Sequence, residues 1–317
     1  MQEQPVDIRK PPCLKRGDLI GLISPASTIA DPARINRGVA YLEGLGYHTI
    51  PGKHILKVHG YLAGTDAERL EDLHAMFANP EVKAIMCIRG GYGTPRLLSH
   101  IDYRLVARNP KIFVGYSDIT VLQLAFWKKC RLVSFQGPMV GVDMADPMDG
   151  YTEELFWRLL TSRKKAGQVL PADEPVQTLK TGKGTGRLLG GNMALLISIM
   201  GTVYLPSFRD AVLFLEDLGE EPYRVDRMIA QLRHASILEG AKAVLFGQFS
   251  DCGPKDATKP TLTLDELFRE ASALTPAPLM VNLPFGHEPR KMTMPIGIRV
   301  RVDAGKKTVE YLESGVQ

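Results

Sequence analysis

Residues 111–120 read Lys111-Ile112-Phe113-Val114-Gly115-Tyr116-Ser117-Asp118-Ile119-Thr120, and this stretch decides the fold. Its first half is a short β-branched and aromatic run, which is typical of a buried strand. From Asp118 to position 126 apolar residues recur at helical spacing, which predicts a helix. A strand that passes into a helix through so short a turn lifts Ser117 clear of the sheet. This is the geometry of a nucleophile elbow, whose following backbone N–H groups can hold an oxyanion.

The same residues allow a plainer interpretation. The usual elbow sequence is Gly-x-Ser-x-Gly, and its last position here is Ile119. Ser117 can also be the N-cap of the following helix, with Thr120 in the first turn. The local sequence leaves both interpretations open. The choice depends on whether the rest of the chain supplies the partners that a nucleophilic serine needs.

Strands and helices alternate around this stretch. Apolar runs at 18–23, 47–50 and 82–88 predict strands, and helical periodicity over 32–45 and 65–77 predicts the helices between them. Such alternation indicates a parallel sheet covered on both faces, with ligands at the carboxyl ends of its strands. We therefore expect an α/β fold that begins with a Rossmann-like, parallel-sheet domain.

The composition changes after Thr161, where Lys, Gly, Pro and Thr become frequent through Gly186. We place a domain boundary there. Residues 1–165 then form the domain that carries Ser117, 166–186 a linker, and 187–317 a second α/β domain. In that second domain the patterns predict helices, strands and a closing hairpin at the following positions: helices at 192–199, 222–232 and 264–273, strands at 211–215, 243–247 and 279–283, and the hairpin over 297–312.

Composition excludes several classes of function. The chain has 317 residues and is 44% hydrophobic, and its 39 basic and 35 acidic residues give a net charge of +4. So balanced a charge predicts no nucleic-acid partner and no membrane surface. No apolar run is long enough for a transmembrane helix, and Met1–Lys15 has no apolar segment typical of a secretory signal. The four scattered cysteines suit a reducing cytoplasm, and no metal or cofactor motif is present.

A glycine cluster, Arg89-Gly90-Gly91-Tyr92-Gly93, follows the predicted strand at 82–88. It does not match the dinucleotide fingerprint, because Arg96 stands at the third glycine position counted from Gly91. The cluster can bring backbone N–H groups to a substrate carbonyl and so form half of an oxyanion hole. It can equally be a tight turn that needs positive φ.

A nucleophilic serine needs a base, and the base needs an orienting carboxylate. Among the seven histidines, His287 differs from the rest because it lies in a proline-punctuated loop directly after a predicted strand. Glu216 and Asp217 end the apolar strand at 211–215, where an acid can support catalysis or simply cap the next turn.

Together, these motifs resemble those of the LD-carboxypeptidases, serine peptidases that trim peptidoglycan-derived peptides, and of their microcin-immunity relatives. The resemblance covers nearly the whole chain. It rests on the joint order and spacing of these motifs: Ile23-Ser24-Pro25-Ala26-Ser27, Arg89-Gly90-Gly91-Tyr92-Gly93, Val114-Gly115-Tyr116-Ser117-Asp118-Ile119-Thr120, Gly190-Gly191-Asn192, Leu213-Phe214-Leu215-Glu216-Asp217, Pro222-Tyr223-Arg224-Val225-Asp226-Arg227, Gly286-His287 and Pro295-Ile296-Gly297.

The resemblance implies a Ser-Glu-His triad. Ser117 would be the nucleophile, His287 the general base and then acid, and Glu216 the carboxylate that fixes the imidazole. The backbone N–H groups of Gly91 and Asp118 would form the oxyanion hole. Since the nucleophile lies in the first domain and its partners in the second, we expect the active site in the cleft between them.

The implied reaction is hydrolysis of an L,D amide bond, in which a muropeptide tetrapeptide loses its terminal D-alanine during peptidoglycan recycling in the cytoplasm. Arg89 and Arg290 are candidates to bind the substrate carboxylate. The family also suggests a homodimer.

Two other functions compete with this one. A microcin-immunity-type peptidase would cleave a peptidyl-nucleotide and would need an aromatic platform for the base. The two tryptophans, Trp127 and Trp157, fall on predicted helices and are interpreted as structural, which favours the muropeptide. A binding protein without catalysis could hold an anion at the glycine cluster, but it would have no need of a triad.

Overall fold

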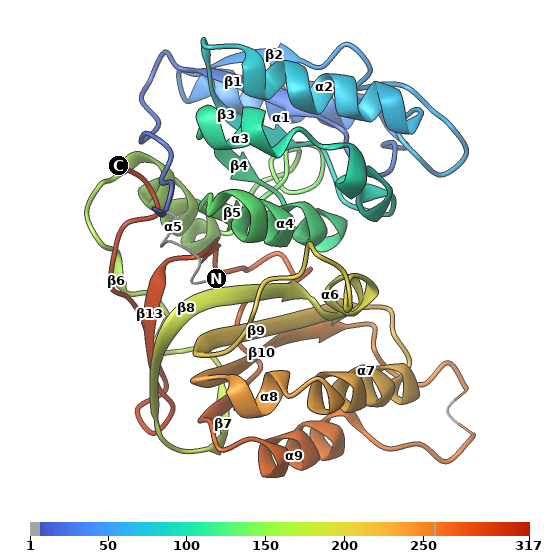
Figure 1. The fold of residues 1–317 in the computed structure, drawn as a ribbon, viewed down its shortest axis with the longest axis vertical. Coiled ribbons are helices and arrows are strands. Elements are labelled where there is room, and N and C mark those ends of the chain that lie inside the picture. Colours follow the sequence, from blue (N-terminus) through green and yellow to red (C-terminus); the bar gives the residue numbers. More distant parts are fainter. Residues whose placement is uncertain (1–6, 257) are drawn as a thin grey trace, which may run out of the picture.

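The computed structural model describes residues 7–256 and 258–317, which form two lobes, each built around its own sheet (Figure 1). The first lobe contains the chain up to about residue 160 and the second most of the remainder, as the change from blue and green to yellow and red shows. Residues 1–6 lie outside the described residues. The start of the predicted first domain, and part of the segment examined for a secretory signal, therefore remain predictions.

The first lobe contains a six-stranded sheet in the order β12-β5-β4-β3-β1-β2. Strands β1 to β5 run parallel, in the order typical of a doubly wound fold, and β12 runs antiparallel to β5. The predicted parallel sheet is thus confirmed. Its strands are β1 (Leu19–Ile23), β2 (His48–Pro51), β3 (Val82–Cys87), β4 (Ile112–Val114), β5 (Ser134–Gln136) and β12 (Met294–Ile296).

Five α-helices of the described residues belong to this lobe: α1 (Ala33–Gly44), α2 (Asp66–Ala78), α3 (Tyr103–Arg108), α4 (Thr120–Cys130) and α5 (Gly150–Thr161). The helix predicted over 65–77 begins with a capping box between Thr65 and Glu68. Helix α4 is buried on nearly every side, because it packs against the first sheet and also meets β8 and α6 of the second lobe (Figure 1).

The second lobe contains an eight-stranded sheet in the order β6-β14-β13-β8-β9-β10-β11-β7. Its central strands β8 to β11 run parallel, and antiparallel strands flank them on both sides. The strands are β6 (Gly167–Gln168), β7 (Gln177–Lys180), β8 (Lys183–Asn192), β9 (Ala211–Leu218), β10 (Ala243–Ser250), β11 (Leu279–Val281), β13 (Arg299–Asp303) and β14 (Thr308–Tyr311). The predicted terminal hairpin corresponds to β13 and β14.

The helices of this lobe are α6 (Met193–Ser198), α7 (Pro222–His234), α8 (Ile237–Gly240) and α9 (Leu264–Leu274). As predicted, α7 begins with proline and buries Val225, Met228, Ile229 and Leu232. No helix in the described part of the chain is both long and apolar enough to cross a membrane.

The segment 166–186 differs from the linker that its composition predicts. It contains β6, β7 and the start of β8, and β6 and β7 form the two outer edges of the second sheet. Edge strands have one unpaired side and carry polar side chains, so their sequence resembles that of a loop. The exposed residues Thr181 and Gly182 are only the connection from β7 to β8.

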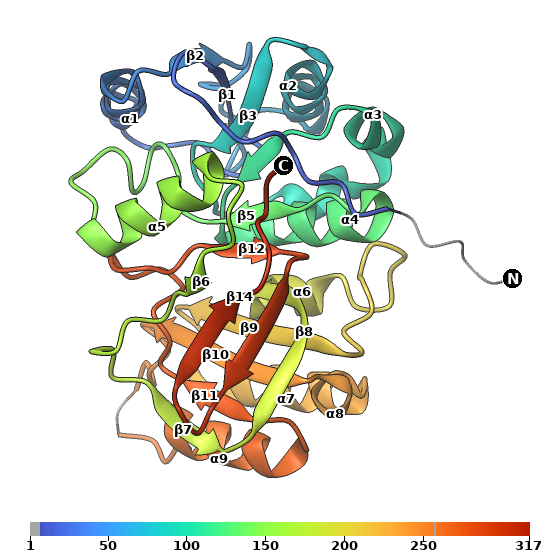
Figure 2. The same ribbon diagram turned by 90° about the vertical axis from the view of Figure 1, so that its left-hand side faces the viewer.

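The chain crosses between the lobes a second time near its C-terminus. After β11 it returns to the first sheet as β12, pairing with β5 from Met294↔Gln136 to Ile296↔Ser134, before β13 re-enters the second sheet (Figure 2). The loop between β11 and β12 therefore connects the two sheets. His287 lies in this loop.

Candidate active site

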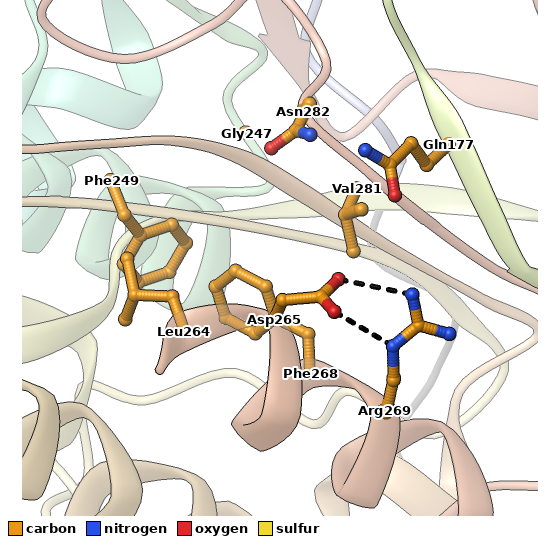
Figure 3. A pocket seen from close by; sticks show the side chains of 9 residues that line it. All are labelled: Gln177, Gly247, Phe249, Leu264, Asp265, Phe268, Arg269, Val281 and Asn282. Atoms are coloured by element: carbon orange, nitrogen blue, oxygen red, sulfur yellow. Dashed lines mark hydrogen bonds and ion pairs between the residues drawn. The ribbon is translucent and has the colours of Figure 1, made fainter. Parts of the chain in front are cut away.

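Two hollows lie at the carboxyl edge of the parallel strands in the second sheet. One, of about 400 Å³, lies at the ends of β10 and β11, above α9 (Figure 3). Its charged groups are Asp265 and Arg269, which form an ion pair with each other at 2.8 Å on the surface of the helix. Both side chains are more than half exposed, so the pair needs no further partner.

The other hollow, of about 320 Å³, lies between the two lobes. Its lining includes residues after β3 and β4 of the first sheet, residues at the ends of β8 and β9 of the second, and a residue of the loop between β11 and β12. Among them are Arg89, Gly90, Gly91, Tyr116, Ser117, Asn192, Asp217 and, from the loop, His287. We call this hollow the catalytic cavity. The first-lobe strands and the second-lobe strands both end here, so the expectation of a site between two lobes fits this position.

Ser117 is the apex of a strained turn. Its φ is +62°, in the left-handed region, between the extended Tyr116 and the 3-10 turn Ser117–Ile119 that leads into α4. Tyr116 occupies the N-cap position of the turn and Ile119 that of α4, so Ser117 is not a helix cap. Backbone strain of this kind, about 1–3 kcal/mol, is typical of functional sites.

The missing final glycine of the elbow has a packing explanation. Ile119 is fully buried, and a Cβ atom on Gly115 would lie 2.9 Å from its side chain. Gly115, which is a glycine in the usual pattern as well, has no side chain and so leaves the room that the Ile119 side chain occupies.

The glycine cluster passes directly beside Ser117. A Cβ atom on Gly90 would lie 2.8 Å from the Cβ of Ser117, so only glycine allows this approach. Gly91 has φ +117° and leaves no room for a Cβ against Ser27, whose Oγ accepts a hydrogen bond from the Tyr92 N–H at 3.1 Å. The cluster is therefore both a tight turn and a backbone surface that faces Ser117.

Asp118 ties this loop to the elbow through its side chain. Its Oδ2 accepts the Thr94 N–H at 2.8 Å, and the Thr94 hydroxyl donates to the Asp118 carbonyl oxygen at 2.6 Å. Burial raises the pKa of the Asp118 carboxyl. The two backbone groups predicted to form the oxyanion hole, Gly91 and Asp118, thus belong to segments that are bonded to each other.

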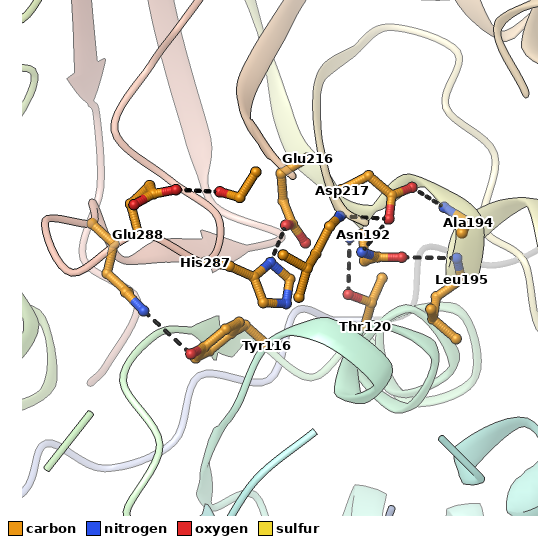
Figure 4. A network of polar contacts seen from close by, with 12 residues as sticks. Tyr116, Thr120, Asn192, Ala194, Leu195, Glu216, Asp217, His287 and Glu288 are labelled. Atoms are coloured by element: carbon orange, nitrogen blue, oxygen red, sulfur yellow. Dashed lines mark hydrogen bonds and ion pairs between the residues drawn. The ribbon is translucent and has the colours of Figure 1, made fainter. Parts of the chain in front are cut away.

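His287 and Glu216, which the sequence predicts to act as base and orienting carboxylate, are in contact. Nδ1 of His287 lies 2.8 Å from Oε2 of Glu216, and the Glu216 side chain is fully buried (Figure 4). Because a carboxylate only accepts, Nδ1 carries the proton and Nε2 is left free to accept one. His287 and Ser117 line the same cavity.

A second acid, Asp217, lies in the wall of the cavity beside Glu216. Its carboxylate accepts hydrogen bonds from Asn192 Nδ2 at 3.0 Å and from the backbone N–H groups of Ala194 and Leu218 at 2.9 Å (Figure 4). Burial, and then the nearby Glu216 charge, raise the pKa of Asp217 to about 7. Asn192 also donates its backbone N–H to Thr120 Oγ1 at 3.0 Å, which joins the second sheet to the elbow helix.

The two arginines proposed for substrate binding lie in different places. Arg89 lines the catalytic cavity. Arg290 is not among the described residues that line it, because its Nε pairs with Glu174 at 2.5 Å and its guanidinium stacks over Tyr151. The sequence around Arg290 gave no sign that Asp173 and Glu174, from the segment 166–186, would pair with it.

The tryptophans are structural, as interpreted from the sequence. Trp127 is buried, and Trp157 stacks on Tyr47 and donates its indole N–H to the Tyr41 hydroxyl at 2.7 Å. Neither is among the described residues lining the catalytic cavity. Sequence reasoning missed the role of Asn192, for which Gly190-Gly191-Asn192 at the end of an apolar run was the available signal.

Comparisons with known proteins show matches over both lobes of the chain. Residues 20–137 match the model of the LD-carboxypeptidase N-terminal domain, and residues 185–302 match that of the C-terminal domain. A probable murein peptide carboxypeptidase of Bacillus subtilis (strain 168) is 38% identical over 97% of this chain and 95% of its own.

Two solved structures are similar over most of both chains. The muramoyltetrapeptide carboxypeptidase from Oxalobacter formigenes has a TM-score of 0.81 and 31% identity, covering 92% of this chain and 97% of that chain. MccF in complex with glutamyl sulfamoyl guanosine has a TM-score of 0.88 and 26% identity, covering 97% and 99%.

Proposed function

The chain belongs to the LD-carboxypeptidase family, and from this membership and the geometry of the catalytic cavity we propose that it is a serine carboxypeptidase that releases the C-terminal D-alanine from muropeptide tetrapeptides. The observation that carries the proposal is the convergence of the strained Ser117 and the His287–Glu216 pair on one cavity between the lobes.

Each residue has a distinct step in the proposed reaction. Ser117 Oγ attacks the scissile carbonyl while His287 Nε2 takes its proton, and the imidazolium that forms is stabilised by Glu216. The N–H groups of Gly91 and Asp118 hold the oxyanion. His287 then protonates the leaving amine, and a water molecule hydrolyses the acyl-enzyme by the same steps in reverse order. The residues need no metal ion or cofactor for these steps.

Two observations support a short peptide with a free carboxylate as the substrate. The relatives in sequence and structure include a murein peptide carboxypeptidase and a muramoyltetrapeptide carboxypeptidase. Arg89 places a cation in the wall of the cavity, where it can pair with the terminal carboxylate. Cleavage at the L,D bond, a function in peptidoglycan recycling and a location in the cytoplasm are part of the same proposal.

A microcin-immunity-type activity on a peptidyl-nucleotide is the second candidate. The TM-score favours MccF, at 0.88 against 0.81, whereas the sequence identity favours the muramoyltetrapeptide enzyme, at 31% against 26%. We give more weight to identity, because both folds are nearly complete matches and specificity depends on side chains. The absence of tryptophan among the described residues that line the cavity also favours the muropeptide.

The test is release of the terminal residue from a muropeptide tetrapeptide, from its all-L counterpart and from a peptidyl-nucleotide. We expect release of D-alanine from the first only, no effect of EDTA, and loss of activity in Ser117→Ala and His287→Ala. Activity that persists in Ser117→Ala would contradict the mechanism. Cleavage of the peptidyl-nucleotide alone would select the second candidate. Light scattering of the same preparation tests the proposed homodimer.

A further inference from the structure

A buried lysine lies behind the proposed catalytic histidine, four residues further along the same loop. Lys291 is only 3% exposed. Its Nζ donates to Asp143 Oδ1 at 2.6 Å and to the Tyr116 hydroxyl at 3.2 Å, and it lies 4.4 Å from the centroid of the Tyr116 ring. A buried ammonium is costly unless it is paired, and here each of its contacts is with a group of the first lobe.

These contacts fasten the loop between β11 and β12 to the first lobe. Besides the Nζ contacts, the backbone N–H of Lys291 donates to Thr152 Oγ1 at 2.7 Å. Asp143 is itself held, because its Oδ2 accepts the Met139 N–H at 2.8 Å. The lysine therefore has a fixed partner on the first lobe rather than a mobile surface acid.

Tyr116 connects this cluster to both reacting groups. It immediately precedes Ser117 in the turn, and its ring meets the His287 imidazole edge-on, with centroids 5.2 Å apart at an interplanar angle of 74°. Its hydroxyl accepts a hydrogen bond from the Lys291 ammonium. One side chain thus contacts the proposed base, precedes the proposed nucleophile and is anchored by Lys291.

We propose that Lys291 is a positioning residue for the hydrolysis proposed above: through Asp143 and Tyr116 it fixes the His287 imidazole relative to Ser117. The inference rests on the proposed function. Glu216 holds the imidazole from the second lobe, whereas Tyr116, which Lys291 anchors, contacts it from the first. Because the nucleophile and the base come from different lobes, a contact within the second lobe alone leaves their separation free to vary. A misplacement of about 1 Å can cost about 100-fold in rate.

Stability alone does not account for the pair. A buried ion pair is often replaced by apolar residues without loss of stability, whereas removal of one partner is strongly destabilising. This difference separates positioning from a structural role. The double variant Lys291→Met/Asp143→Leu removes both charges, so it should fold nearly as well as the wild type while lacking the contact that anchors Tyr116.

The experiment compares thermal unfolding, kcat and KM for D-alanine release in Lys291→Met, in Asp143→Leu and in the double variant. We expect each single variant to lose stability and the double variant to recover most of it. We expect kcat of the double variant to remain about 10- to 100-fold below wild type with KM nearly unchanged. A double variant with wild-type kcat would overturn the proposal.

Two further variants sharpen the test. Lys111→Met is the matched control, because Lys111 is also a buried lysine, 5% exposed, but its Nζ donates to the backbone carbonyl of Met76 at 2.8 Å. It should lose stability and keep the wild-type kcat. Tyr116→Phe keeps the ring beside His287 and removes the hydroxyl, so it should cause part of the loss seen in the double variant, and the two losses should not add.

The rate at which a fluorophosphonate labels Ser117 separates this inference from the choice of substrate. That rate depends on the alignment of Ser117 and His287 but not on a muropeptide. If the wild type is labelled but releases no D-alanine, the proposed substrate is wrong, and slower labelling of the double variant by about 10-fold or more still supports positioning. Equal labelling rates in the wild type and the double variant overturn it.

Discussion

The two hollows at the carboxyl edge of the second sheet differ in how their polar groups are arranged. At the ends of β10 and β11 the charged residues are exposed and pair along one helix (Figure 3). At the ends of β8 and β9 the carboxylates are buried and bonded to groups from separate segments (Figure 4). The larger of these two hollows is therefore the one without buried charged groups among its described lining residues. Convergent buried polar groups, rather than volume, therefore mark the site.

The difference follows from which elements form each hollow. The larger hollow is lined by residues of the second lobe and of the segment before β8. Its charged side chains, Asp265 and Arg269, are exposed and can be hydrated by water. The catalytic cavity is lined by residues of both lobes, and the two acids beside it, Glu216 and Asp217, are buried. A buried carboxylate is costly unless it is bonded, so its partners must be built into the fold.

The largest effect is expected for Glu216→Gln, which tests the dyad. An amide at this position can donate to His287 Nδ1 and so stabilise the wrong tautomer, and the loss of kcat should be about 10³- to 10⁴-fold with the fold intact. The measurement is D-alanine release alongside circular dichroism. A variant that keeps a tenth of the wild-type rate would show that the buried pair is structural.

A smaller loss is expected when the tie between the glycine cluster and the elbow is cut. Thr94→Val removes the hydroxyl that donates to the Asp118 carbonyl oxygen, while the backbone donors remain. Loss of an oxyanion donor costs about 10²- to 10³-fold, so loosening the segments that carry them should cost less, about 10-fold, and should act on kcat rather than KM. Thr94→Ser, which keeps the hydroxyl, is the control and should stay near wild type.

The raised pKa of Asp217 predicts a pH dependence of stability. Its value of about 7 in the folded protein exceeds the ordinary value of about 3.9, so the folded state binds this proton more tightly. The resulting stabilisation is full below about pH 4 and is lost as the pH rises to about 7. Thermal unfolding should therefore show that wild type loses stability relative to Asp217→Asn between about pH 4 and about pH 7. If the stabilities of wild type and Asp217→Asn change in parallel across this window, the hydrogen bonds to Asp217 offset the effect of its burial, and the pKa is not raised.

The smallest effect is expected at the other hollow. Arg269→Ala removes an exposed pair within one helix, which contributes about 0.3–0.5 kcal/mol. Activity should stay within about twofold of wild type, and urea unfolding should detect at most this small loss. A tenfold fall in the rate of D-alanine release would contradict the distinction drawn between the two hollows, and would show that the larger one takes part in substrate binding.

Local patterns predicted the strand, short turn and helix around Ser117, the parallel first sheet and the terminal hairpin, because their signals lie within a few residues of each other. They did not predict β12, since its three residues include Pro295, which argues against a strand except at an edge. They gave no sign of the partners of Arg290, because Asp173 and Glu174 lie more than a hundred residues away in the sequence. Polar side chains that pair across long sequence distances produce no periodic pattern, so the sequence does not predict their pairing.

The return of β12 to the first sheet has a consequence for expression of the lobes as separate fragments. A fragment that ends near residue 165 would leave β5 as an open edge, with the backbone of Ser134–Gln136 unpaired on one side. Such an edge favours association with other chains. The complementary fragment would carry β12 without a partner strand. Circular permutation or insertion of a cleavable loop is therefore better suited than truncation to a study of the lobes, since both keep all the crossings between them in one folded unit.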